Sequence, residues 1–160
     1  MASTTFSGPV TATNGFISGS GSLVTVDADV TLTSASHAGR TMLLDVASGA
    51  TVTLPAASGT GNVYKFFVKT TVTSNNYKIQ VASGDDTMAG VAVVANDGGA
   101  TASIFETVAA SDTITLNGGT TGGILGGQVE IQDVASGVFS VVVRGAATGT
   151  EATPFSAAVS

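Results

Sequence analysis

Side chains that could carry out chemistry are few in this chain. Its 160 residues include one histidine, His37, and no cysteine, which excludes disulfides, thiolate nucleophiles and thiolate metal ligands. A catalytic histidine needs a nucleophile to activate and a third group that orients its ring. No recognisable triad motif surrounds His37. We therefore predict that His37 is a turn residue, that the chain has no catalytic residues and that the protein is not an enzyme.

Two pairs of acidic residues are the next candidates. Asp27 and Asp29 lie two positions apart in a segment with strand character and so share a face, whereas Asp85 and Asp86 lie in a turn. Calcium takes about six to eight oxygen ligands, and the chain has no spaced acidic loop such as an EF-hand. The sequence does not exclude a glycosidase-type carboxylate pair, but it shows no environment that would raise the pKa of one of these carboxyl groups. We predict solvated carboxylates, no metal site and no cofactor.

A glycine-dense stretch, Asn117 to Gly127, resembles a phosphate-binding loop only superficially. The P-loop signature requires Gly-Lys followed by Ser or Thr, and this stretch contains no lysine. It also precedes a segment with strand character, where a P-loop precedes a helix. We predict that these glycines allow tight turns or close backbone approach.

Composition restricts the partners of the protein. Charged residues make up 10% of the chain, against about 25% in an ordinary globular domain, and the net charge is −6. With no basic patch to neutralise phosphates, we expect no binding to nucleic acid and none to anionic membranes.

The longest apolar run, Met88 to Ala95, is too short to span a bilayer. The first residues lack Lys, Arg and an apolar run, so we expect no secretory signal and synthesis in the cytoplasm.

The stretch Asn62 to Val81 contains four of the nine aromatic residues (seven Phe and two Tyr) and three of the five basic ones. Its first arm alternates, with Tyr64, Phe66 and Val68 on one face, and its second arm places Tyr77, Ile79 and Val81 on one face. Period-two alternation is typical of strands with one buried face. Ser74 to Asn76 lies between the arms, and Asn tolerates the left-handed backbone of tight turns. We predict a β-hairpin that serves as the packing centre of the protein.

Further short segments with strand character are separated by turn signals, and no segment has helical spacing with caps. They are Leu23–Thr33, Thr41–Val46, Ala50–Leu54, Val91–Ala95, Ala100–Val108, Thr113–Leu116, Gln128–Gln132 and Val138–Arg144. The last two read as a pair joined through Ala135 to Gly137. The pattern predicts an all-β protein, a β-sandwich or jelly-roll-like domain at 23–145, with an extended N-terminal arm at 1–22 and a C-terminal tail at 146–160. A frayed terminus is the alternative to an arm at 1–22, because that segment has few apolar residues.

Several stretches, taken together, carry a family resemblance. They are Phe6-Ser-Gly-Pro-Val with Asn14-Gly-Phe16, Thr51-Val-Thr-Leu-Pro55 through Gly59-Thr-Gly-Asn-Val-Tyr64, Ser111-Asp-Thr-Ile-Thr-Leu-Asn-Gly-Gly with Thr121-Gly-Gly, and Gly149-Thr-Glu-Ala-Thr-Pro-Phe155. The set resembles small head decoration (cement) proteins of tailed bacteriophages and covers most of the chain in pieces.

The resemblance implies a structural virion protein with no catalytic residues. It implies a homotrimer or similar oligomer, assembled in the host cytoplasm and seated on the outer capsid surface, that bridges neighbouring major capsid proteins and stabilises their lattice. Arms of such proteins often reach across the lattice. By that analogy the capsid-contacting positions are Phe6, Ser7, Gly8, Pro9, Val10, Asn14, Gly15 and Phe16.

Three other functions compete with capsid decoration. A head fibre or tail-spike module would bind host-surface glycans, whose sites present exposed aromatic faces beside polar groups; the chain has no Trp, which weakens this alternative. A glycan hydrolase is disfavoured by the missing triad and metal motif. A pilus or bacterial surface subunit is disfavoured by the missing secretory signal.

Overall fold

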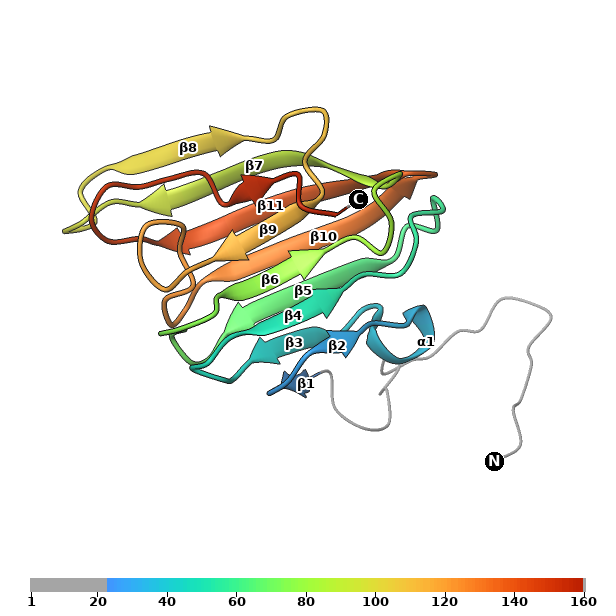
Figure 1. Ribbon diagram of the computed structural model, residues 1–160, viewed down its shortest axis with the longest axis horizontal. Helices are drawn as coiled ribbons and strands as arrows, with labels where there is room; N and C mark the ends of the chain where they lie inside the picture. The colour runs from blue at the N-terminus through green and yellow to red at the C-terminus, as the bar shows by residue number, and fades with distance from the viewer. Residues whose placement is uncertain (1–22, 160) are drawn as a thin grey trace, which may run out of the picture.

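The structure is a computed structural model that describes residues 23–159, which form two packed β-sheets (Figure 1). The seven-stranded sheet contains, in spatial order, β1 (Leu23–Val26), β3 (Thr41–Leu44), β5 (Val63–Val68), β10 (Gln128–Ala135), β11 (Val138–Ala146), β7 (Thr87–Ala95) and β8 (Ala102–Glu106). The five-stranded sheet contains β12 (Phe155–Ser156), β9 (Thr113–Leu116), β6 (Tyr77–Gln80), β4 (Ala50–Thr53) and β2 (Val30–Thr31). The prediction of an all-β sandwich is confirmed.

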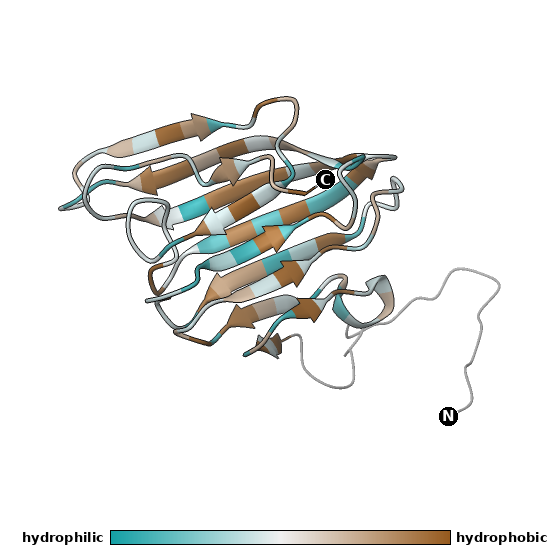
Figure 2. Cartoon of the chain, in the orientation of Figure 1, coloured by the Kyte–Doolittle hydropathy of each residue, from teal (hydrophilic) through white to brown (hydrophobic). Residues whose placement is uncertain are grey.

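The core lies between the sheets and follows the alternation of the strands. Tyr64 and Phe66 of β5 and Tyr77 and Ile79 of β6 are all buried in one hydrophobic cluster. Figure 2 shows the same alternation as hydrophobic and hydrophilic bands along single strands. Burying one such side chain contributes about 1.5–3 kcal/mol, so these residues are a main source of stability.

The first six strands wind as a coil between the two sheets. β1, β3 and β5 are parallel neighbours in the seven-stranded sheet, and β2, β4 and β6 are parallel neighbours in the five-stranded sheet. Each strand is therefore followed along the chain by a strand in the opposite sheet, and each circuit of the chain stacks beside the previous one.

The predicted hairpin at Asn62 to Val81 is wrong, because its two arms lie in different sheets. β5 pairs with β3 and β10, whereas β6 pairs with β4 and β9. The predicted faces are correct, since Tyr64, Phe66 and Val68 are buried opposite Tyr77, Ile79 and Val81. Alternation identifies the buried face of a strand but does not identify the strand with which it pairs. Asn75 and Asn76 do adopt positive φ angles of 55° and 63°, which turn the chain from one sheet to the other.

Side-chain hydrogen bonds hold consecutive turns of this coil together. The buried Tyr77 hydroxyl accepts a bond from the Val46 N–H (2.9 Å) and donates to the Thr70 carbonyl (3.0 Å). The carboxylate of Asp45 accepts bonds from Lys69 Nζ and Thr70 Oγ1, each at 2.6 Å. The bonds from Lys69 and Thr70 hold the pKa of Asp45 below its usual value. The β3–β4 and β5–β6 connections are thereby joined to each other.

The second half of the chain completes both sheets. β10 and β11 form the predicted antiparallel pair, and β7 lies parallel to β11. β9 runs antiparallel to β6, and β12 pairs with β9 through Phe155 and Ser156. Residues that the sequence analysis assigned to a C-terminal tail thus add a strand to the five-stranded sheet, with Phe155 buried.

One short helix, α1 (Ser34–His37), forms where the sequence predicted only a turn. The Thr33 N–H donates to Nδ1 of His37 at 2.9 Å, so the histidine side chain bonds the backbone at the start of this single turn. Four residues are too few to show the helical spacing on which the prediction relied.

Candidate interaction face

The eight predicted capsid-contacting residues, Phe6, Ser7, Gly8, Pro9, Val10, Asn14, Gly15 and Phe16, lie outside the described residues. The segment that contains them joins the sandwich at Leu23, the first residue of edge strand β1. The structure thus places the connection of this segment at one edge of the seven-stranded sheet.

The residues considered for catalysis or metal binding are not brought together. Asp29 accepts a bond from the Thr51 N–H (2.7 Å). The prediction of a solvated carboxylate is wrong for Asp86, which is buried because it accepts a bond from the Ala57 N–H (3.0 Å) of another segment. His37 bonds only within its own turn at Thr33. Within residues 23–159 no group of three or more His, Asp or Glu side chains could hold a metal ion.

The sequence analysis did not identify two buried carboxylates, those of Asp112 and Asp133. Asp112 accepts bonds from the N–H groups of Ala158 (2.8 Å) and Val159 (3.2 Å) and ties the C-terminal segment to the sandwich. Asp133 lies on the inner face of β10. The alternation of Val129, Ile131 and Asp133 was the signal that could have found it, because it places all three side chains on the buried face.

Asp133 binds the loop that precedes β5. Its Oδ1 accepts the N–H groups of Ser58 (3.0 Å) and Gly59 (2.7 Å), and its Oδ2 accepts the N–H (3.0 Å) and hydroxyl (2.6 Å) of Thr60. Burial acts to raise the pKa of Asp133, but the bonds from Thr60, Gly59 and Ser58 together outweigh it and lower that pKa. The ionised carboxylate is therefore a structural group that organises a loop.

The glycine-dense stretch forms tight turns, as predicted. Asn117 Oδ1 accepts bonds from the N–H groups of Gly119 (2.9 Å) and Thr121 (3.1 Å). Gly118 has a φ angle of 77°, and a Cβ there would lie 1.8 Å from the Val72 carbonyl oxygen. The N–H groups of Gly119 and Thr121 thus bond to a side chain of the same loop, that of Asn117. The backbone at Gly118 packs against Val72.

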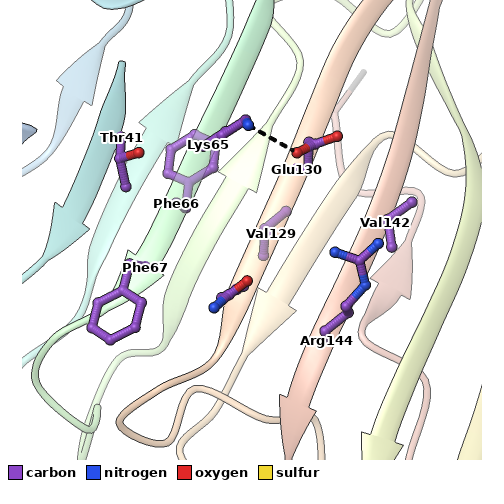
Figure 3. A pocket seen from close by; sticks show the side chains of 9 residues that line it. Thr41, Lys65, Phe66, Phe67, Val129, Glu130, Val142 and Arg144 are labelled. Carbon is purple, nitrogen blue, oxygen red and sulfur yellow. Dashed lines mark ion pairs between the residues drawn. The ribbon is translucent and has the colours of Figure 1, made fainter. Parts of the chain in front are cut away.

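The outer face of the seven-stranded sheet is the face turned away from the five-stranded sheet, and it carries both charged and apolar side chains. Register places Thr41, Lys65, Glu130 and Val142 in one row across β3, β5, β10 and β11. A second row across β5, β10 and β11 contains Phe67, Gln128 and Arg144. A hollow of about 190 Å³ lies over these two rows (Figure 3).

Charge in this outer hollow is only partly paired. Lys65 Nζ lies 3.4 Å from Glu130 Oε2, with each side chain about half exposed (54% and 50%). Such an exposed pair contributes at most about 1 kcal/mol, so it does not lock the surface. Arg144 forms no ion pair within residues 23–159 and extends beside Val142 (Figure 3). The hollow thus offers a planar cation, an amide and a half-buried aromatic ring to a binding partner.

Exposed apolar side chains continue the outer face toward β8. Val91 and Val93 of β7 are each 37% exposed, and Ile104 of β8 is 68% exposed. Val91 lies beside Val142, and Val93 lies between Arg144 and Ile104. Apolar and polar groups therefore share one continuous surface over β5, β10, β11, β7 and β8.

Comparisons with protein-family models, with curated proteins and with solved structures found no match to this chain. None of the helices in residues 23–159 is long and apolar enough to cross a membrane.

Proposed function

We propose that this chain is a structural virion protein, a decoration or cement protein that binds the outer surface of a tailed-phage head and stabilises the lattice of the major capsid protein. The observation that carries the proposal is the outer face of the seven-stranded sheet. It combines exposed valines with the half-buried Phe67 and with Arg144, which forms no ion pair within residues 23–159. Aromatic residues and arginine are enriched at protein–protein interfaces, and charged residues are depleted at the interface core.

The low charge of the chain supports the same proposal. With 10% charged residues in the chain, most of its surface requires no desolvation of an ion when a protein covers it, and the charges of the outer hollow are those of Lys65, Glu130 and Arg144. Many copies on one shell gain avidity from their neighbours, so each contact can be modest. The resemblance supplies the partner and the location, namely the major capsid protein on the outside of the head.

Segment 1–22 supports capsid binding through its point of attachment. It joins β1 at the edge of the same seven-stranded sheet, and Leu23, its first described neighbour, is 57% exposed. Extended chain spans at most about 3.3–3.6 Å per residue, so this segment could reach well beyond the sandwich. Contacts from the arm and from the outer face would then act together, and the resemblance implies a homotrimer or similar oligomer as the assembly.

Cosedimentation with capsids that lack the protein tests the proposal. We expect the double variant Phe67→Ala/Arg144→Ala to lose at least about tenfold in capsid affinity, because truncating hot-spot residues costs about 2 kcal/mol or more and 1.4 kcal/mol corresponds to tenfold. Lys78→Ala is the matched control, since Lys78 is an exposed cation of β6 in the other sheet. Full binding by a folded double variant would place the capsid contacts elsewhere.

A glycan-binding role is the second candidate, because Phe67, Gln128 and Arg144 lie in one row across the outer hollow, with Gln128 in the middle. Sugars pack on aromatic faces and bond to neighbouring polar groups. The same double variant separates the two functions in a glycan-binding screen. Sugar binding that is lost in the double variant, together with no binding of the wild type to capsids, would favour the glycan-binding role.

A further inference from the structure

The open edge of the seven-stranded sheet is formed by β8. One side of β8 pairs with β7, and the other side pairs with no strand of residues 23–159 (Figure 1). Natural edge strands usually carry a lysine, a proline, a bulge or an inward-pointing charge that prevents further pairing. The sequence of β8, Ala-Ser-Ile-Phe-Glu, has only the terminal Glu106. β8 is therefore open to pairing with another strand.

The register shows which backbone groups of β8 are free. Flanking the strand, the Thr107 N–H donates to Gly90 O (3.1 Å) and the Asn96 N–H donates to Thr101 O (3.0 Å). In an antiparallel ladder hydrogen-bonded pairs alternate with non-bonded pairs. Ser103 and Phe105 therefore bond to β7, whereas the N–H and C=O groups of Ala102, Ile104 and Glu106 point to the open edge.

Apolar side chains are available on both sides of this edge. On the outer face Ile104 is 68% exposed, beside Val93. On the inner face, Phe105, Val108 and Phe155 line a hollow of about 290 Å³, and Val108 is 68% exposed. An added strand would find hydrogen-bonding groups along its length and apolar contacts above and below.

We propose that β8 pairs with β8 of a second copy of this chain, antiparallel, about a two-fold axis at Ile104. Ile104 then faces Ile104 of the second copy, and the free N–H and C=O of each bond to the other. Ala102 faces Glu106 of the second copy, and Ser103 faces its Phe105. The two seven-stranded sheets become one continuous sheet.

Self-complementarity is the reason for choosing a second copy as the occupant. Because both backbone groups of Ile104 point to the open edge, a two-fold axis at Ile104 makes the two facing Ile104 residues a hydrogen-bonded pair. The two Glu106 residues each face an alanine and lie about 14 Å apart along the strand, at roughly 3.4 Å per residue, which exceeds the Debye length of about 8 Å. Parallel pairing would place them side by side. In the antiparallel register, therefore, no two residues of like charge face each other.

This pairing does not rest on the proposed function, and it predicts a dimer where the family resemblance implies a trimer. Light scattering coupled to size exclusion distinguishes them for the full chain. We expect a dimer at twice 15.6 kDa, with dissociation on dilution. Ile104→Lys should shift the protein to monomer without loss of folding, because two lysines would meet at the axis. Leu23→Lys, the same change on an exposed residue of the opposite edge strand, should leave the dimer intact.

A disulfide test measures the register itself. Directly opposed residues of a hydrogen-bonded antiparallel pair have Cα atoms about 5.5 Å apart, within the range that a disulfide spans. The chain has no native cysteine, so an oxidised Ile104→Cys variant should form a covalent dimer on a non-reducing gel, and Leu23→Cys should not. A trimer or a monomer at all concentrations, or cross-linking of Ile104→Cys no greater than that of Leu23→Cys, would overturn the proposal.

Discussion

At the scale of single residues, Asp133 shows how one buried carboxylate organises a loop far from it in sequence. It is 3% exposed and binds the backbone of residues 58–60, up to 75 positions away. An asparagine side chain has one carbonyl oxygen and one NH₂ group. Asp133→Asn would therefore place an NH₂ group against two of the donors that the carboxylate now accepts.

We expect Asp133→Asn to lower the free energy of unfolding at neutral pH by about 1–3 kcal/mol, because buried donors lose their acceptor. Asp85→Asn is the matched control: Asp85 is exposed and bonds only Ser83 within its own turn, so its substitution should change little. Urea unfolding of both variants at one protein concentration measures the difference. Equal stability of the two variants would show that the Asp133 bonds contribute little.

The lowered pKa of Asp133 adds a pH dependence with a definite sign. A carboxyl whose pKa is lower in the folded state contributes stability above its unfolded pKa of about 3.9, and that contribution is lost as the pH falls through the folded pKa. The stability gap between the wild type and Asp133→Asn should therefore be full near neutral pH and should shrink below about pH 4. A gap that stays constant into acid would contradict the assigned ionisation.

At the scale of elements, the longest pairing among residues 23–159 joins β7 to β11 and requires a glycine near its centre. Gly90 faces Val141, and a Cβ there would lie 1.8 Å from the Val141 carbonyl oxygen. Backbone atoms cannot move aside as the end of a flexible side chain can. β7 and β11 can approach at this point because Gly90 has no side chain.

We expect Gly90→Ala to separate β7 from β11 locally and to cost about 1–3 kcal/mol or more, which is typical of overpacking. Thermal unfolding should show a midpoint lower by several degrees, since about 1 kcal/mol corresponds to roughly 2–4 °C in a chain of this size. Gly119→Ala is a suitable control, because its nearest neighbour atom would be 3.6 Å from the new Cβ. An unchanged midpoint for Gly90→Ala would mean that the strands adjust without strain.

At the scale of the whole molecule, the core formed by residues 23–159 draws on both sheets. Its buried residues extend from Val26 in β1 to Phe155 in β12 and come from both sheets. Segment 1–22 precedes this core, and its capsid-contacting role stays a prediction from the family resemblance.

Deletion of residues 2–20 should leave a folded protein that no longer binds capsids. We expect its unfolding midpoint to match that of the full chain, because no strand of residues 23–159 is removed, and its capsid affinity to fall by at least about tenfold. Circular dichroism and cosedimentation measure the two effects separately. Unfolding of the shortened chain would assign the segment to the core, and undiminished binding would place the capsid contacts on the sandwich alone.

The sequence by itself determined the fold class and the buried faces of many strands. Alternation in β5 and β6 correctly placed Tyr64, Phe66, Tyr77 and Ile79 in the core, and turn chemistry correctly located the positive φ angles of Asn75 and Asn76. These features are local, because side-chain direction and backbone preference depend on neighbouring residues. The outer hollow was not predicted, since Phe67, Gln128 and Arg144 meet only through the register of three strands.

Apart from the pair β10 and β11, which the sequence had indicated, only the tertiary structure decided which strands pair. Neighbouring β5 and β6 looked like a hairpin yet lie in opposite sheets, and β5 instead pairs with β10, more than sixty positions further along the chain. Backbone hydrogen bonds are nearly the same for every residue, so they do not specify a partner. Partner choice follows from burying the inner faces of both sheets together, and Asp133 acquires its loop-binding role only once that packing brings residues 58–60 beside β10.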